Sequence, residues 1–184
     1  MTIDPYAALQ TATRAHRMAT HSDAYTFEDG PALTQVAARS GAVRMLELGT
    51  ALGYTACCLA AARPDARVDT IEGDPLRAGL ARDNIAVAGL ADRVTVHQGD
   101  FMAVLARLTA GYGLVFFDGY APDLSMLNAI IDRLSPGGTL VCANLGLAGV
   151  NERQRLLATL DDPSQFTQLE PIEKGGTVVR RRLR

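Results

Sequence analysis

The sequence predicts a single doubly wound α/β domain, in which helices cover both faces of a mostly parallel, seven-stranded sheet. Three observations predict this fold. The chain has 184 residues, a length that suits one domain with one sizeable core. Apolar segments of strand length alternate with segments of helical periodicity from residue 43 onward, which is the order of βαβ units. The mainly apolar segments 43–48 and 114–117 suit strands that are covered on both faces.

Residues 1–41 are expected to form a helical segment that precedes an α/β core over residues 42–184. Apolar side chains recur at helical spacing over 5–19 and again over 30–40, with a polar hinge between them. Gly41 follows the second helix in the position of a C-terminal cap.

The core then alternates between strands and helices. In chain order we expect a strand at 43–48, a helix at 54–62, a strand at 67–71, a helix at 75–88, a strand at 93–97, a helix at 101–108, a strand at 114–117, a helix at 122–134, a strand at 139–142, a helix at 151–160 and two further strands near 166–169 and 177–181. Pro64 ends the first of these helices, and Pro75 stands in the first turn of the second. The turn Pro136-Gly137-Gly138 leads into the fifth strand.

Composition and charge argue against several classes of protein. Hydrophobic residues make up 48% of the chain, and the formal net charge of −2 gives no sign of a nucleic-acid-binding or membrane-binding surface. No apolar run approaches the ~18–20 residues of a membrane-spanning helix, and the N-terminus lacks the pattern of a signal peptide. The three cysteines, two of them adjacent, indicate buried thiols in a reducing compartment. We therefore expect a cytoplasmic protein.

Ligands of parallel sheets bind beyond the carboxyl ends of the strands, so the residues after each strand are the candidates for a site. The first strand ends in ELGTALGYT, where Gly49 and Gly53 allow sharp turns and the close approach of a ligand. A dinucleotide site would have GxGxxG, but Ala51 and Tyr54 replace two of its glycines. The carboxylate of Glu47 disfavours a pyrophosphate and suits a cationic ligand such as S-adenosylmethionine (SAM), which carries a sulfonium and an ammonium. The alternative is that the glycines serve only the turn.

Polar side chains follow the next strands as well. Glu72 ends the second strand, about 20 residues after the glycine loop, where it could accept hydrogen bonds from both hydroxyls of a ribose. After the third strand, Asp100 could accept from an adenine amino group and Phe101 could cover the ring; alternatively, Asp100 caps the next helix. Asp118 follows the fourth strand, where it could hold an ammonium group, join a metal site or orient a methyl acceptor.

Several motifs resemble those of one known family. They are LELGTALGYT after the first strand, IEGDP after the second, QGDF after the third and LSPGGTLV before the fifth. Together they resemble the catechol and caffeoyl-CoA type O-methyltransferases, a family of class I SAM-dependent methyltransferases, over most of the chain. The resemblance implies a Rossmann-like fold and SAM as cofactor. The cofactor-binding residues that it implies are Glu47, Gly49, Thr50, Gly53, Tyr54, Thr55, Glu72, Gly73, Asp100, Phe101, Asp118 and Tyr120.

The residues after the fourth and fifth strands, where the family has its catalytic residues, depart from the family's pattern. The family binds a divalent metal through an aspartate after the fourth strand and an Asp-Asn pair after the fifth. Here Asp118 and Asn144 stand at two of these positions, but Ala143 replaces the aspartate of the pair, and Tyr120 and Ala121 replace a further Asp-Lys. Mg²⁺ prefers near-octahedral oxygen ligation, usually with one or two carboxylates. We therefore expect a degenerate metal site, with Asp118 and Asn144 as weak candidate ligands.

The acceptor side of the site is less defined. A phenol, with a pKa of about 10, needs help to ionise at neutral pH. Asp118 is the expected catalytic residue, and His21 and His97 are the other candidate bases. The loop at 145–150 is short, which indicates an open acceptor pocket or one that a second subunit completes. We expect a homodimer that transfers a methyl group to an oxygen, or less readily a nitrogen, of a small or mid-sized molecule; a nucleic acid is not the expected acceptor.

Two other functions stay open from the sequence. The domain could bind the cofactor but have lost metal-dependent catalysis, because Ala121 and Ala143 replace residues of the family's catalytic pattern. It could also be an NAD-dependent oxidoreductase, since NAD would accept Glu72 equally well, although Glu47 and Tyr54 argue against a pyrophosphate site.

Overall fold

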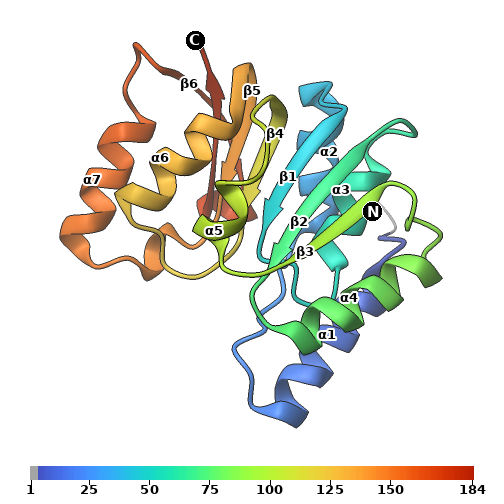
Figure 1. Cartoon of the computed structure of the whole chain (residues 1–184). Coiled ribbons are helices and arrows are strands. Elements are labelled where there is room, and N and C mark those ends of the chain that lie inside the picture. The colour runs from blue at the N-terminus through green and yellow to red at the C-terminus, as the bar shows by residue number, and fades with distance from the viewer. Residues whose placement is uncertain (1–3) are drawn as a thin grey trace.

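The computed structural model describes residues 4–184, which form a seven-stranded sheet between two layers of helices (Figure 1). The strands are β1 (Arg44–Leu48), β2 (Arg67–Glu72), β3 (Val94–Gln98), β4 (Tyr112–Phe117), β5 (Leu134–Cys142), β6 (Phe166–Ile172) and β7 (Thr177–Arg182). The helices are α1 (Ala7–Thr20), α2 (Gly30–Ser40), α3 (Tyr54–Ala61), α4 (Pro75–Val87), α5 (Phe101–Leu105), α6 (Leu124–Arg133) and α7 (Val150–Leu160), with the short 3-10 helices η1 (Leu145–Leu147) and η2 (Glu173–Gly175).

The sheet has the strand order β3-β2-β1-β4-β5-β7-β6. The strands from β1 to β5 pair in parallel, whereas β7 runs antiparallel to both β5 and β6. The predicted fold class, a doubly wound α/β fold with a mostly parallel sheet, is therefore confirmed. The chain builds outward from β1 to β3 and then returns to place β4 on the other side of β1. In open α/β sheets the crevice at such a switch point is where ligands bind.

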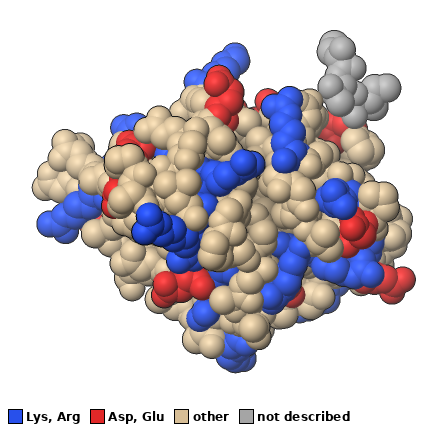
Figure 2. All heavy atoms as spheres, turned by 90° about the horizontal axis from the view of Figure 1, so that it is seen from above, with Lys and Arg blue, Asp and Glu red and all other residues tan. Residues whose placement is uncertain are grey.

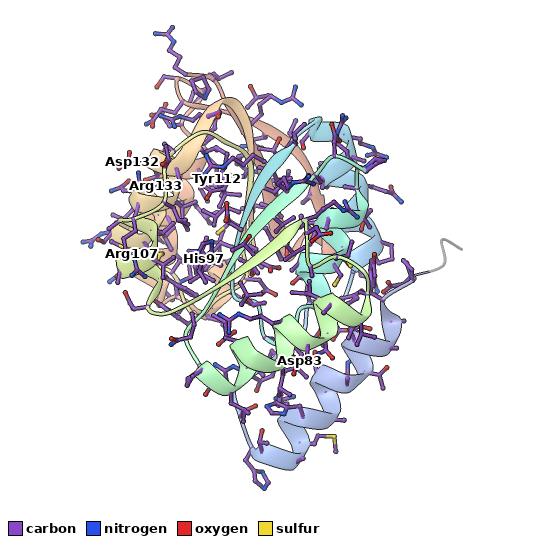
Figure 3. All side chains as sticks on the ribbon, turned by 45° about the vertical axis from the view of Figure 1, so that its right-hand side comes forward. Asp83, His97, Arg107, Tyr112, Asp132 and Arg133 are labelled. Carbon is purple, nitrogen blue, oxygen red and sulfur yellow. The ribbon has the colours of Figure 1, made fainter. Side chains whose placement is uncertain are left out.

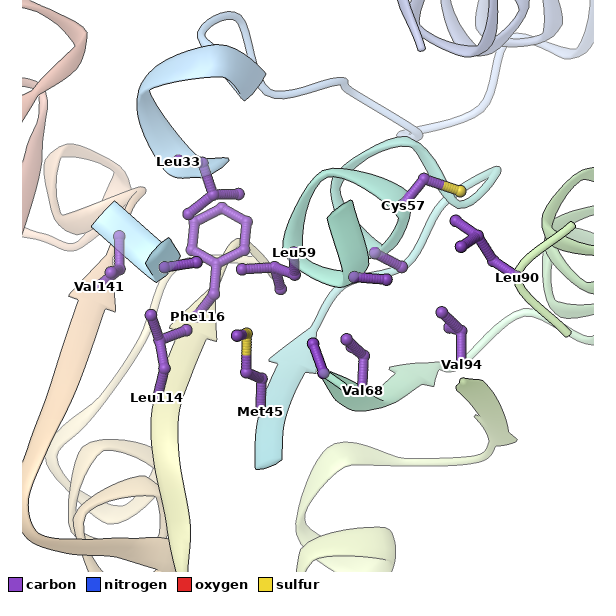
Figure 4. Packing of buried hydrophobic residues seen from close by; sticks show 14 of the residues in the cluster. Leu33, Met45, Cys57, Leu59, Val68, Leu90, Val94, Leu114, Phe116 and Val141 are labelled. Carbon is purple, nitrogen blue, oxygen red and sulfur yellow. The ribbon is translucent and has the colours of Figure 1, made fainter. Parts of the chain in front are cut away.

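The alternation of side chains along the strands supplies a core on each face of the sheet. In β4, Leu114 and Phe116 belong to the cluster that packs against α2, α3 and α4, whereas Val115 and Phe117 belong to the cluster under α5, α6 and α7. Figure 4 shows the first cluster, in which Leu33 of α2 lies close to Phe116. Burial of each such side chain stabilises the folded state by roughly 1.5–3 kcal/mol. The strand ends, which carry the loops of the site, are therefore firmly held.

Several element boundaries differ from those expected. β4 begins at Tyr112 and β5 at Leu134, because these two residues pair with each other ahead of the Pro-Gly-Gly turn and leave a register shift in the ladder. α6 begins later than expected, at Leu124, because the side chain of Asp123 caps it by accepting from the Met126 amide at 2.8 Å. α5 is shorter than expected, since the backbone after it tightens into turns.

The outside of the domain carries mixed charge. Figure 2 looks down on the edge of the sheet where the parallel strands begin, and basic side chains are spread over this face with acidic ones between them. Along residues 4–184, the helices are all too short or too polar to cross a lipid bilayer. The candidate site lies at the opposite edge of the sheet, where the parallel strands end.

Candidate functional site

A cavity of about 600 Å³ lies at the carboxyl ends of the parallel strands. The linker between α1 and α2, residues 21–29, closes one side of it; we call this linker the strap, and Figure 1 shows it in blue beneath the strand ends. Of the predicted site residues, Gly49, Thr50, Tyr54, Thr55, Glu72, Phe101, Asp118, Tyr120 and Asn144 line the cavity, whereas Glu47, Gly53, Gly73 and Asp100 do not.

The loop after β1 brings backbone close to the cavity. Gly49 has a φ of +102°, and its amide donates to the Ile71 carbonyl at 3.0 Å. A Cβ at this position would lie 2.5 Å from the carbonyl oxygen of Asp118, so the loop requires glycine here. Gly53, with a φ of +96°, begins α3 and faces Ile85 instead of the cavity. The two glycines thus serve different purposes: Gly49 permits the close approach to the backbone that follows β4, and Gly53 precedes the first turn of α3.

Glu47 lies beneath this loop and is fully buried. Its Oε2 accepts a hydrogen bond from Thr70 Oγ1 at 2.5 Å, and Thr70 Oγ1 lies 2.6 Å from Thr50 Oγ1. Its Oε1 has no hydrogen-bond partner among the described residues. Burial raises the pKa of Glu47 to about 7, against the opposing effect of the Thr55 and Thr70 hydroxyls. Thr50 and Thr55 line the cavity, whereas Glu47 does not, so the effect of Glu47 on the cavity passes through these hydroxyls.

Glu72 stands at the edge of the cavity with both carboxylate oxygens bonded. Its Oε2 accepts from the Ala51 amide at 2.8 Å, which fixes the loop after β1 to the end of β2. Its Oε1 accepts from the Asp74 amide and from Arg77 Nε, each at 3.0 Å. Arg77 also lines the cavity and was not anticipated from the sequence, because it lies within α4 and not directly after a strand.

An aromatic pair forms one wall. The rings of Phe101 and Tyr120 are stacked, with centroids 5.4 Å apart and an angle of 9° between the planes. Gly119 leaves room for this pair, because a Cβ there would lie 2.5 Å from the Phe101 ring. Asp100 caps α5 by accepting from the Ala103 amide at 3.0 Å. The capping role considered for Asp100 is therefore present, and its side chain stands outside the lining.

Asp118 and Asn144 meet in the cavity. Asn144 Nδ2 donates to Asp118 Oδ1 at 3.0 Å and to the Gly119 carbonyl at 2.8 Å. Because the Gly119 carbonyl can only accept, the amide nitrogen must be the atom turned toward both groups. Burial raises the pKa of Asp118 well above that of an ordinary aspartate, and the nearby charges of Glu47 and Glu173 raise it further.

These residues do not fit a divalent metal. The Asn144 amide directs a donor, not an oxygen, toward Asp118, and Ala143 brings no ligand to the cavity that it lines. Over residues 4–184 there is no cluster of three or more His, Cys, Asp or Glu side chains arranged to hold a metal ion. Asp118 and Asn144, the weak candidate ligands, bond to each other instead, and we derive no catalytic step through a metal.

The two histidines considered as bases lie elsewhere. His21 ends α1 in a left-handed conformation and is exposed. His97 Nε2 lies 2.7 Å from Asp69 Oδ1, and the Tyr112 hydroxyl donates to the other oxygen of that carboxylate at 2.8 Å. Figure 3 labels His97 and Tyr112 on the sheet. Neither histidine lines the cavity, so among the candidate bases Asp118 is the one that does.

Another cavity residue, Glu173, does not follow a parallel strand and was not expected from the sequence. Glu173 of η2 lines the cavity, accepts from the Glu28 amide at 3.1 Å and accepts from Thr177 Oγ1 at 2.7 Å. It has a φ of +51°, which is uncommon for a residue other than glycine. β7 is antiparallel, so its beginning, and not its end, lies at the carboxyl edge of the parallel strands. If the last strand had been predicted as antiparallel, the residues before it would have been candidates for the site.

Known proteins are similar to this chain in sequence and in fold. The sequence profile of a family described as a methyltransferase domain matches residues 46–145. The catechol O-methyltransferase of Mycobacterium tuberculosis is 40% identical over 168 residues, which cover 83% of this chain and 76% of that protein. The O-methyltransferase imqG of Aspergillus flavus is 36% identical over 121 residues, or 55% of this chain; the match spans about half of that relative, 49% of its length.

A solved structure matches along the whole chain. The O-methyltransferase TomG from Streptomyces achromogenes, involved in tomaymycin synthesis and solved in complex with SAM, has a TM-score of 0.84 and 28% identity. The alignment covers 100% of this chain and 92% of that one. The family profile, the relatives and the fold agree with the motifs after the strands. The chain therefore belongs to the methyltransferase-domain family.

Proposed function

We propose that this protein transfers the methyl group of SAM to an oxygen atom of a small or mid-sized acceptor molecule. The observation that carries the proposal is the charge of the cavity at the strand ends. Five carboxylates line it, those of Asp23, Glu28, Glu72, Asp118 and Glu173. They outnumber the two arginines that pair with them, since Arg77 pairs with Asp23 and Glu72, and Arg14 pairs with Glu28. Such surroundings favour a ligand with positive charge, and SAM carries a sulfonium and an ammonium. The SAM-bound relative TomG, whose fold matches this chain over its full length, supports the same choice.

The residues around the cavity fit this cofactor. Gly49 lets the loop after β1 approach a ligand closely, and Glu72 offers carboxylate oxygens of the kind that ribose hydroxyls bind. The stacked pair of Phe101 and Tyr120 offers an aromatic face for the adenine. Glu47, held through Thr70, fixes the floor beneath the loop. We assign the cofactor to this part of the cavity and the acceptor to the part between Asp118 and the strap.

Asp118 is the proposed base. When SAM is bound, it supplies an electrophilic methyl group, and the task of the protein is to present an acceptor oxygen with an available lone pair. Burial raises the pKa of Asp118, so its ionised carboxylate takes a proton more readily than an ordinary aspartate does. The hydrogen bond from Asn144 holds the carboxylate in place beside the cavity. The strap and the loops after the strands line the cavity on opposite sides, which favours a fixed acceptor orientation.

The test combines binding with turnover. Calorimetry with S-adenosylhomocysteine should show saturable binding to the wild type, and a panel of phenols and catechols should include a methylated product by mass spectrometry. Asp118→Asn keeps the size and the contact with Asn144, so we expect it to bind S-adenosylhomocysteine normally but to transfer at least about 100-fold more slowly. Binding without turnover on any acceptor would indicate a cofactor-binding domain that has lost catalysis. Binding of NADH without binding of SAM would indicate an oxidoreductase.

The cellular setting and the assembly are part of the proposal. We propose a homodimer in the cytoplasm. The three cysteines are free and buried, which supports a reducing compartment. Tyr25 and Leu147 line the cavity yet are 68% and 65% exposed, which supports a second subunit near its mouth. Analytical ultracentrifugation should give twice the chain mass of 19.6 kDa. A single species at the mass of one chain would contradict the dimer.

A further inference from the structure

Arg77 contacts carboxylates from two separate parts of the chain. Its Nε and Nη2 atoms each lie 3.0 Å from Glu72 Oε1, and its Nη1 donates to Asp23 Oδ1 at 2.8 Å. Glu72 ends β2, whereas Asp23 belongs to the strap. One guanidinium therefore joins the strap to the residue that we assign to the ribose.

The two contacts of Arg77 differ in their surroundings. The side chain of Glu72 is 6% exposed and that of Arg77 is 18% exposed, so the inner ion pair is shielded from water. The side chain of Asp23 is 85% exposed, so the outer ion pair stands in solvent, where such pairs are weak and open readily. The outer contact can therefore break while the inner one persists.

The inner contact leaves Glu72 able to bind a ligand. An ionised carboxylate offers about four acceptor positions. Arg77 and the Asp74 amide both donate to Oε1, and the Ala51 amide donates to Oε2. Oε2 thus keeps a free acceptor position, while Arg77 fixes the orientation of the group.

The two halves of the strap are fastened differently. Its second half is held by both backbone and side chains. Gln10 Nε2 donates to the carbonyls of Phe27 at 2.8 Å and Glu28 at 3.2 Å, and the Glu28 amide donates to Glu173. The Phe27 ring is also buried against Phe116, and the Glu28 side chain pairs with Arg14. Its first half is held through side chains, by the Asp23–Arg77 pair and by the stacking of Arg17 on the Tyr25 ring at 3.7 Å. Opening of the strap should therefore begin at the first half.

We propose that Arg77 is a positioning residue that couples the strap to the cofactor: it orients Glu72 for the ribose and, through Asp23, holds the strap closed while the cofactor is bound. The Asp23–Arg77 contact then sets the rate at which the cofactor leaves. This inference rests on the proposed function, since it requires that the cavity binds SAM.

The test measures the release of S-adenosylhomocysteine from the full chain. Protein loaded with the tritiated compound is mixed with an excess of unlabelled compound, and the dissociation rate is followed. Asp23→Asn should release the ligand about two- to fivefold faster, in keeping with the strength of an exposed ion pair. Asp65→Asn is the matched control, because Asp65 is also an exposed aspartate paired with an arginine, Arg63, at 3.0 Å, but lies away from the cavity. It should release the ligand at the wild-type rate.

Replacement of Arg77 separates positioning from a general effect on stability. Arg77→Gln should weaken binding at least about tenfold, because a shielded carboxylate loses its charged partner, and Arg77→Lys should recover part of this loss. In turnover assays Arg77→Gln should raise the KM for SAM and leave kcat unchanged. In the Arg77→Gln background, Asp23→Asn should have no further effect on release, since the two residues act through one contact.

Defined outcomes would overturn the proposal. Release from Asp23→Asn at the wild-type rate would show that the strap is not latched through this contact, and wild-type affinity in Arg77→Gln would remove the positioning role. If Arg77→Gln does not fold, Arg77→Lys and Asp23→Asn can still be compared with the wild type in affinity and release rate. Failure of the wild type itself to bind S-adenosylhomocysteine would refute the proposed function instead.

Discussion

Replacement of Gly49 by alanine should damage both the stability of the domain and its ligand site. At Gly49 the φ is +102°, and a Cβ would lie 2.5 Å from the carbonyl oxygen and 2.8 Å from the carbonyl carbon of Asp118. A side chain in left-handed backbone costs about 1–2 kcal/mol. The contact adds about 1–3 kcal/mol, the typical cost of overpacking, because the atoms it meets are backbone and cannot rotate away. We expect a total loss of about 2–5 kcal/mol.

Two other glycines serve as controls. Gly41 has a φ of +69°, and a Cβ there would meet no atom within 4 Å, so Gly41→Ala carries the backbone strain without the clash. Gly79 lies within α4 and is equally open, so Gly79→Ala should stabilise the protein by about 0.5–1 kcal/mol. The difference between the Gly49 and Gly41 variants isolates the contact with Asp118.

Thermal unfolding and calorimetry provide the assay. In a domain of this size, 1 kcal/mol shifts the Tm by about 2–4 °C. Gly49→Ala should lower the Tm by about 4–20 °C and weaken the binding of S-adenosylhomocysteine, whereas Gly41→Ala should lower it by about 2–8 °C with binding unchanged. Equal Tm values for the two variants, together with wild-type binding by Gly49→Ala, would show that the close contact with Asp118 does not require glycine.

Three further predictions follow from the buried carboxylates and the aromatic wall. Burial raises the pKa of Glu47 from its usual 4.5 to about 7, so between these pH values the folded state keeps a proton that the unfolded chain loses. The free energy of unfolding, measured in urea, should therefore fall by about 3 kcal/mol as the pH rises from 4.5 to 7. Glu47→Gln should flatten this dependence of stability on pH. Tyr120→Ala removes the ring stacked on Phe101 and should raise the KM for SAM about two- to tenfold with kcat unchanged, whereas an unchanged KM would remove the ring from the adenine site. Because Asn144 directs its amide nitrogen at Asp118, methyl transfer should survive treatment with EDTA, and its loss with recovery on adding Mg²⁺ would restore a metal to the mechanism.

Much of the fold follows from local patterns. The buried strands β1 and β4 have apolar side chains on both faces, and each is followed by a turn and a helix start that the sequence marks with glycine, proline or aspartate. The positions of Glu72 and Asp118 could be predicted because both stand at the end of a parallel strand, and the topology carries such residues to one edge.

The remaining features of the site depend on the direction of side chains and on contacts between distant parts of the chain, which local sequence patterns do not encode. Glu47 lies within β1, not after it. Because side chains alternate between the two faces of a strand, Glu47 shares the face of Met45 and lies beneath the loop that follows β1. Arg77 and Glu173 reach the cavity from a helix and from the turn before an antiparallel strand. His97 satisfies Asp69 on the neighbouring strand, a pairing that only the register reveals.

A crystal structure with S-adenosylhomocysteine would show whether the cavity at the strand ends binds SAM. We expect the ribose at Glu72, the sulfur and amino-acid part beside the Gly49 loop and the adenine against the Phe101–Tyr120 pair. A ligand bound elsewhere, with Glu72 touching no atom of it, would show that this cavity is not the cofactor site.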